Sequence, residues 1–247
     1  MIHCGLAHSG SWGRVARTLS GALTMTAFDT PGHGRSDAWD GRDEIQKLTA
    51  EIAADFLTQP TDVIGHSFGA TVALRLAAMR PELVRSLTLI EPVFFAVALA
   101  DRPEIAPAFK ASQSDFGTAM ERGDTLTAAR DFTRIWGDGT PWEVIPEDVK
   151  QSLADQMYLI MASHDALNND VGGMLEEGVL DTLHCPVLLM EGSKSPAIIR
   201  DINKGLSARL PNTTHAMIMG AAHMAPLAPS DQVAVEVLRF LDQSKET

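Results

Sequence analysis

The sequence predicts an α/β protein in which a mostly parallel sheet is flanked by helices and interrupted by a helical cap insertion. Short apolar runs alternate with longer amphipathic stretches, the order expected when each parallel strand is followed by a crossover helix. Strand-like runs vanish over residues 94–180, where helical stretches dominate. Ser67, with a glycine two residues before it and another two residues after it, separates an apolar run from a helical one.

Length and composition fit one globular domain with an insertion. The chain has 247 residues, of which 45% are apolar and 21% charged, close to the averages for globular proteins. We expect residues 1–93 to form the N-terminal part of the α/β core, residues 94–180 the cap, and residues 181–247 the C-terminal part of the core.

Charge and cysteine content restrict the partners of the protein. The net charge of −12 argues against binding to nucleic acid or to an anionic membrane, because neither surface attracts an acidic protein. No apolar run approaches the roughly 20 residues needed to span a bilayer. Cys4 and Cys185 form neither a metal-ligand spacing nor a disulfide framework. We therefore expect a cytoplasmic protein with reduced thiols that acts on a small molecule, while its oligomeric state stays open.

The first expected elements are a helix over 12–19, a strand over 23–28 and a helix over 45–56. The strand ends at a loop over 29–37 that is dense in Gly, Pro, Asp and Ser, the residues typical of turns. The second helix has apolar residues along one face: Ile45, Leu48, Ile52 and Phe56.

The remaining core elements surround Ser67 and follow the insertion. A β-prone run over 61–64 leads to Ser67, a helix follows over 70–79, and a strand over 86–90 ends just before Glu91. After the insertion we expect four elements: a strand over 186–190, a helix from about Pro196 with Ser195 as N-cap, a strand over 216–219, and a helix over 233–241 with Ser230 as N-cap.

Strand, glycine-flanked serine and helix form the local context of a nucleophile elbow. The pentapeptide is Gly65-His66-Ser67-Phe68-Gly69. In such a turn the serine adopts strained backbone angles, and the small flanking residues let strand and helix approach closely. The helix N-terminus then lies beneath the hydroxyl and favours developing negative charge. An ordinary glycine-rich turn with an incidental serine is the alternative, so the rest of the sequence decides between them.

Four motifs occur in a fixed order, each at the end of an expected strand. They are His3-Cys4-Gly5 with Trp12, Asp29-x-Pro31-Gly32-x-Gly34-x-Ser36, the pentapeptide at 65–69, and Gly220-x-x-His223. In these motifs and their order, the chain resembles α/β-hydrolase-fold proteins of the serine-hydrolase type, from its first residue to near its last. The resemblance implies that Ser67 is the nucleophile and His223 its base. A serine hydroxyl is a poor nucleophile near neutral pH and needs such a base within hydrogen-bond reach.

The third catalytic residue departs from the common pattern of the family. An aspartate is usual in a Gly-x-x-Asp context, but this segment reads Gly192-Ser193-Lys194-Ser195. Serine cannot supply the anion that fixes the histidine tautomer and stabilises the imidazolium. Some family members carry their acid at the preceding strand end, which makes Glu91 the first choice here.

Two other carboxylates compete with Glu91 for that role. Glu191 is the second choice, although its place at a junction of strand and loop would let it point away from His223. Asp29 is expected to organise its own loop.

The resemblance also implies an oxyanion hole, two backbone N–H groups that stabilise the tetrahedral intermediate. Phe68 follows the nucleophile and supplies the first donor. Gly5 takes the second position, with Leu6 as an alternative because Cys4 replaces the usual glycine. The alternative for residues 3–5 is a frayed N-terminus without defined geometry.

The sequence therefore predicts a serine hydrolase that cleaves a small ester or related acyl bond through an acyl-serine intermediate, without a metal or organic cofactor. Serine rather than aspartate in the elbow disfavours epoxide opening and dehalogenation. The alternative is a non-catalytic ligand-binding protein, or an inactive fragment that lacks N-terminal strands. In the family a central strand leads into the residues equivalent to His3, whereas only Met1 and Ile2 precede it here. A chain beginning at Met1 is therefore expected to be poorly stable, because neighbouring strand edges lose a partner.

Overall fold

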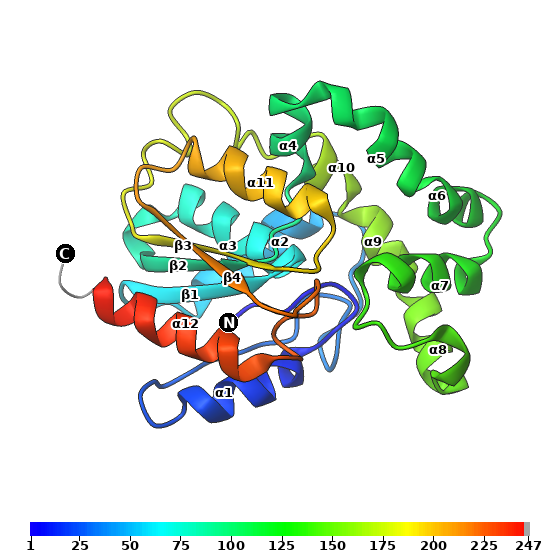
Figure 1. The fold of residues 1–247 in the computed structure, drawn as a ribbon, viewed down its shortest axis with the longest axis horizontal. Helices are drawn as coiled ribbons and strands as arrows, with labels where there is room; N and C mark the ends of the chain where they lie inside the picture. Colours follow the sequence, from blue (N-terminus) through cyan, green and yellow to red (C-terminus); the bar gives the residue numbers. More distant parts are fainter. Residues whose placement is uncertain (245–247) are drawn as a thin grey trace.

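A computed structural model describes residues 1–244, and its centre is a parallel sheet (Figure 1). Four strands lie in sequence order across the sheet: β1 (Thr61–His66), β2 (Val84–Ile90), β3 (Val187–Gly192) and β4 (Thr213–Ile218). All three neighbouring pairs are parallel. The carboxyl ends of the strands therefore meet along one edge, where ligand sites of such sheets form.

Helices cover both faces of the sheet (Figure 1). One face packs against α2 (Ile45–Asp55), α3 (Phe68–Met79) and α11 (Ala197–Ser207). The other face packs against α1 (Gly13–Leu19), which follows the short helix η1 (Ser9–Trp12), and against α12 (Ser230–Gln243). Successive strand residues point to opposite faces, so Val187 and Leu189 join the first core while Leu188 and Met190 join the second.

Ile2 lies between β1 and a segment that precedes α2. Its backbone forms parallel bridges with Phe28 on one side and with Gly65 on the other. Its N–H donates to the carbonyl of Ile64, and its carbonyl accepts from His66. The main chain around Ile2 is thereby ordered, which does not fit the reading of this segment as a frayed end.

The strand expected over 23–28 was wrong, since Phe28 alone in that segment forms a bridge. Met1 and Ile2 are the backbone neighbours with which the segment pairs, and a strand needs a longer run of partners. A cavity of about 280 Å³ is lined by residues 22–26 and by β1. The expectation of absent N-terminal strands stays a prediction.

The chain between β2 and β3 is helical wherever it is regular. Figure 1 shows α5 to α9 beside the sheet, whereas α4 packs against α11 and α10 packs against α4. We take residues 94–180 as the cap, a division that stays a proposal. The helices of this stretch are α4 (Phe95–Asp101), η3 (Pro103–Ile105), α5 (Ala106–Ser112), α6 (Ser114–Glu121), α7 (Thr125–Trp136), η4 (Trp142–Val144), α8 (Glu147–Asp155), α9 (Met157–Ala162) and α10 (His164–Asn168).

Two expected helix caps were wrong. Helix α11 begins at Ala197 and α12 begins at Ser230, so prolines occupy both N-cap positions and no side chain caps either helix. A proline N-cap is compatible with these starts because its fixed φ leads directly into a helix. The hydroxyl of Ser195 is thereby free for another partner, which lies in the site described below.

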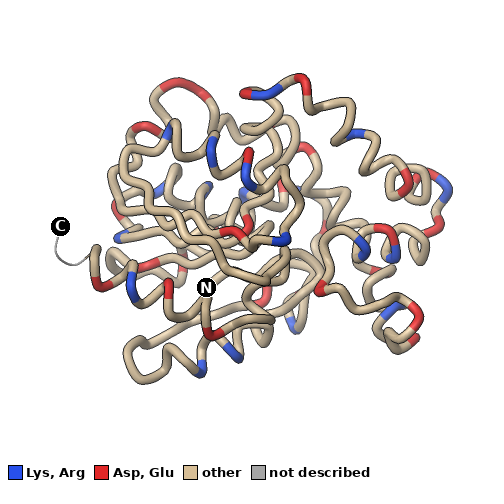
Figure 2. Tube along the Cα trace, viewed as in Figure 1, with Lys and Arg blue, Asp and Glu red and all other residues tan. Residues whose placement is uncertain are grey.

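Acidic and basic residues are interspersed over the core and the cap (Figure 2). Within residues 1–244 no helix is long and apolar enough to cross a membrane.

Candidate active site

The turn between β1 and α3 holds Ser67 in a strained conformation. Its φ is 54° and its ψ −119°, in the region that side-chain-bearing residues rarely adopt. The two flanking glycines are required by close approach: a Cβ on Gly65 would lie 2.2 Å from the Gly69 carbonyl oxygen, and one on Gly69 would lie 2.3 Å from that of Ile2. The strand–turn–helix geometry therefore lifts Ser67 to the edge of the sheet at the N-terminus of α3.

A continuous chain of hydrogen bonds joins Ser67, His223 and Glu91 at this edge. His223 Nε2 lies 2.8 Å from Ser67 Oγ, and His223 Nδ1 lies 3.2 Å from Glu91 Oε2. The three residues come from the turn after β1, the loop after β4 and the end of β2. All three are buried, and the Glu91 side chain is fully inaccessible to solvent. Such a chain can move the serine proton to the imidazole while the carboxylate stabilises the positive ring.

Glu91 is held by its second oxygen and by its backbone. Oε1 accepts the backbone N–H of Gly192 at 2.5 Å and the hydroxyl of Ser195 at 2.6 Å. The φ of Glu91 is 52°, a left-handed conformation that turns the side chain out of the line of β2. A buried carboxylate needs such donors because desolvation disfavours its charge.

The other two carboxylates considered from the sequence lie elsewhere. Glu191 receives hydrogen bonds from Arg200 Nε at 3.1 Å and Asn203 Nδ2 at 3.2 Å, both on α11. Asp29 accepts the backbone N–H groups of Ser9 and Arg35 at 2.6 and 2.9 Å. These backbone hydrogen bonds hold the pKa of Asp29 well below its usual range.

Two backbone N–H groups of residues beside Ser67 have no acceptor among residues 1–244. They belong to Gly5 and Phe68, and both residues line the same pocket as Ser67. The N–H of Leu6, the alternative donor, is already used, because it donates to His33 Nε2 at 3.0 Å. The geometry thus leaves Gly5 and Phe68 available to an oxyanion.

Two buried histidines fasten the loop that contains Gly5. His33 accepts from the Leu6 N–H as described, and His3 Nε2 accepts the Thr30 N–H at 2.9 Å. Because both ring nitrogens act as acceptors, both rings must be neutral. Burial lowers the pKa of His3 to about 4 and also lowers that of His33. The loops at 3–6 and 29–37 are therefore locked together only while these rings stay unprotonated.

His66 fixes the other side of the site. Its Nε2 donates to the carbonyl oxygen of His223 at 2.8 Å, since a carbonyl can only accept. Burial lowers the pKa of His66 to about 3. This residue gave no clear signal in the sequence, yet it anchors the main chain of the catalytic-histidine candidate.

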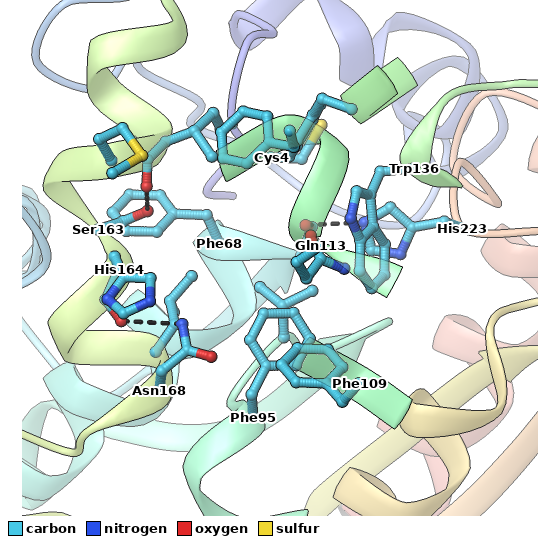
Figure 3. Close-up of a pocket in the computed structure, with 18 of the residues that line it drawn as sticks. Cys4, Phe68, Phe95, Phe109, Gln113, Trp136, Ser163, His164, Asn168 and His223 are labelled. Carbon is cyan, nitrogen blue, oxygen red and sulfur yellow. Dashed lines mark hydrogen bonds between the residues drawn. The ribbon is translucent and has the colours of Figure 1, made fainter. Parts of the chain in front are cut away.

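A pocket of about 420 Å³ opens above Ser67, between the sheet edge and the cap (Figure 3). Phe95 and Phe109 form one side, with ring centroids 4.8 Å apart, and Trp136 lies beside His223. The Trp136 ring meets the His223 ring edge-on at 4.8 Å. The lining is mainly aromatic and aliphatic, with polar side chains such as Gln113, His164 and Asn168 (Figure 3). An apolar pocket with a few polar groups is the usual form of a small-molecule site.

Sequence reasoning missed the contributions of Ser195 and Trp136 to this site. Ser195 had a plain alternative as a helix cap, and its contact with Glu91 spans 104 residues. Trp136 lies in the insertion, in no motif that would distinguish it from an aromatic residue of a packed core. Within the described chain, no group of three or more His, Cys, Asp or Glu side chains could hold a metal ion.

The family model described as the alpha/beta hydrolase family matches residues 1–237. The chain belongs to this family. The alpha/beta hydrolase fold accounts for the parallel sheet with helices on both faces, and membership makes the protein a hydrolase.

Relatives of this alpha/beta hydrolase include enzymes that act on esters. Lipase LipV of Mycobacterium tuberculosis is 30% identical over 246 residues, which cover 96% of this chain and 90% of the relative. The pimeloyl-[acyl-carrier protein] methyl ester esterase of Aeromonas salmonicida is 26% identical over 93% of this chain and 89% of its own length. Among solved structures, MenH of S. aureus has a TM-score of 0.69 at 18% identity, over 99% of this chain and 92% of that one. The structural likeness supports the fold alone.

Proposed function

We propose that this alpha/beta hydrolase cleaves carboxylic esters of small molecules through an acyl-serine intermediate. The observation that carries this proposal is the hydrogen-bond chain from Ser67 Oγ through His223 to Glu91 Oε2, with distances of 2.8 and 3.2 Å. The names of the relatives, a lipase and methyl ester esterases, support an ester as the bond that is cleaved.

Acylation begins when Ser67 Oγ attacks the ester carbonyl carbon and its proton passes to His223 Nε2. Glu91 Oε2 accepts the hydrogen bond of Nδ1–H, which keeps Nε2 free as the base and stabilises the imidazolium. The N–H groups of Gly5 and Phe68 bind the oxyanion of the tetrahedral intermediate. The C–O bond to the alcohol then breaks, and the leaving oxygen takes the proton from His223.

Deacylation repeats the same proton transfers with water. His223 takes a proton from water, the resulting hydroxide adds to the acyl carbon, and Ser67 leaves as the intermediate collapses. Ser67 recovers its proton from His223, and the free carboxylic acid departs. Each step therefore balances with the three side chains and one water molecule.

The pocket supports an apolar acyl or alcohol group as the part of the substrate bound beside Ser67. Phe95, Phe109 and Trp136 contribute aromatic surface next to the serine, and no Asp or Glu of the described chain lines this pocket. A volume of about 420 Å³ suits a small or medium-sized ester. The hydrolysis rates of esters with acyl chains of increasing length will show the longest chain that this pocket accommodates.

A fluorophosphonate probe, which reacts with activated serines, tests the assignment directly. We expect covalent labelling of the wild type, none of Ser67→Ala, and strongly slowed labelling of His223→Ala. p-Nitrophenyl esters of increasing acyl length then give kcat/KM for the same three proteins. Labelling that survives both substitutions refutes the nucleophile and the base. A folded wild type that neither labels nor turns over these esters would refute ester cleavage through an acyl-serine intermediate.

A further inference from the structure

The two oxygens of the Glu91 carboxylate have different partners. Oε2 faces His223 Nδ1 at 3.2 Å, whereas Oε1 accepts two hydrogen bonds, from Gly192 N at 2.5 Å and Ser195 Oγ at 2.6 Å. Gly192 is the last residue of β3, the strand next to β2, and Ser195 lies in the turn that follows it. The hydrogen bonds from Gly192 and Ser195 therefore hold the carboxylate by the oxygen that does not face His223.

A glutamate that orients a catalytic histidine must itself be held in one orientation. The last torsion of a Glu side chain is soft and roughly two-fold, so the carboxylate plane is not fixed by the chain itself. Glutamate also has one more rotatable bond than aspartate, and ordering it costs additional entropy. With no solvent access to Glu91, water cannot supply the missing donors. The donors from Gly192 and Ser195 are what set the carboxylate plane.

The turn that holds Glu91 also contacts the loop that carries His223. Lys194 N–H donates to the Ala221 carbonyl at 2.8 Å, and Ser193 N–H donates to that of Ile218 at 3.0 Å. A Cβ on Gly192 would lie 2.4 Å from the Ala221 carbonyl oxygen, so only glycine permits this approach. One rigid turn thus fixes the relative position of the acid and the histidine loop.

We propose that Ser195 is a positioning residue of the hydrolase, whose hydroxyl holds Glu91 in the orientation that serves His223. The inference rests on the proposed ester hydrolysis. Ser195 stands where the family resemblance places an aspartate, so the turn after β3 still serves the histidine, but through Glu91 and as a hydrogen-bond donor.

Removal of the hydroxyl has a kinetic signature. Ser195→Ala leaves Oε1 with the Gly192 donor alone, and a hydrogen bond to a charged group is among the stronger ones. We expect kcat for p-nitrophenyl butyrate to fall about tenfold, which corresponds to ~1.4 kcal/mol in the barrier. KM should change less than twofold because Ser195 does not line the substrate pocket.

The split between kcat and KM, together with rescue by a second hydroxyl, supplies a readout that a purely structural role would not move. A purely structural role would lower the amount of folded protein in Ser195→Ala and leave the kcat of the folded fraction unchanged. A positioning role lowers the kcat of the folded protein, and a threonine at the same position restores it.

Three further variants, compared with the wild type and with Ser195→Ala, make the test decisive. Ser195→Thr keeps a hydroxyl and should recover most of kcat, whereas Ser195→Asp brings a second carboxylate to Glu91 and should be worse than Ser195→Ala. Ser207→Ala is the matched control, because this serine bonds Thr213 and His215 at the other end of α11. Near-UV circular dichroism checks that each variant is folded.

The outcomes separate this inference from the proposed function. If the wild type hydrolyses the ester and Ser67→Ala does not, the proposed function stands. If Ser195→Ala then retains the kcat of the wild type, the positioning role alone is overturned. Equal losses in Ser195→Ala and Ser195→Thr would overturn it as well. A folded wild type without labelling or turnover would overturn both.

Discussion

Exchange of Glu91 for glutamine should reverse the tautomer of His223 while leaving the packing intact. The two partners of Oε1, the Gly192 N–H and the Ser195 hydroxyl, are both donors. They require the amide oxygen of the glutamine, so its NH₂ group must face His223 Nδ1. Nδ1 can then only accept, which forces the imidazole proton onto Nε2. From there it donates to Ser67 and cannot take the serine proton.

The magnitude follows from losing both the base and the counter-charge. An Asp→Asn exchange with the same tautomer consequence in a serine protease lowers kcat by about 10⁴-fold. We expect a loss of about 10³- to 10⁴-fold for Glu91→Gln, which corresponds to ~4.1–5.4 kcal/mol in the barrier. Glu91→Ala removes the counter-charge but leaves Nδ1 free to keep its proton. The isosteric glutamine should therefore be at least as damaging as alanine, the reverse of the order expected from packing.

The assay is steady-state hydrolysis of a p-nitrophenyl ester, with thermal unfolding measured on the same preparations. Glu191→Gln serves as the matched control, because Glu191 ends the neighbouring strand and bonds Arg200 rather than His223. Less than a tenfold loss in a folded Glu91→Gln variant would refute the reasoning. A larger loss in Glu191→Gln would transfer the role to that residue.

Three further predictions concern the turn, the acid stability and the cap. Gly65→Ala places a Cβ 2.2 Å from the Gly69 carbonyl oxygen at the start of α3. We therefore expect the variant to lose either its fold or its fluorophosphonate labelling, and normal labelling would contradict this. Burial lowers the pKa of His3 to about 4 and that of His66 to about 3. In the unfolded chain the histidine pKa is near 6.5, so the unfolded chain binds these protons at a higher pH than the folded protein does. The free energy of unfolding is therefore highest above pH 6.5. It declines as the pH falls toward 4, by roughly 1–3 kcal/mol per group at pH 4.5. Equal urea midpoints at pH 7 and 4.5 would exclude this. Trp136→Ala removes the cap's contact with His223 and should lower kcat/KM ten- to a hundredfold; unchanged kinetics would mean that the ring only fills space.

Much of the core was predictable because its signals are local. The runs before Ser67 and Glu91 were expected as strands, and the structure has β1 over Thr61–His66 and β2 over Val84–Ile90. An apolar run between turn signals specifies a buried strand wherever it finds partners on both sides. The segment 23–28 had the same pattern but only a short backbone to pair with, so propensity alone was insufficient.

The site was predictable to the extent that contiguous residues encode it. The glycines around Ser67 dictate the turn, and the motif order indicated His223. Which carboxylate approaches the imidazole could not be deduced, because Glu91 and Glu191 end neighbouring strands and both follow apolar runs. The Glu91 carboxylate lies 3.2 Å from His223 Nδ1 and its backbone has a φ of 52°, whereas Arg200 and Asn203 hold Glu191 against α11.

The α/β architecture and the turn at Ser67 follow from sequence patterns that are local in the chain, and the family follows from the order of four such local motifs. Three contacts of the site depend on the tertiary structure: Ser195 donates to Glu91, the Trp136 ring meets the His223 ring, and the Leu6 N–H donates to His33. These contacts span 104, 87 and 27 residues respectively. Their geometry is set by the parallel register of the sheet and by the loops packed at its edge. No pattern within one segment specifies such positions, because the partner lies in another part of the chain.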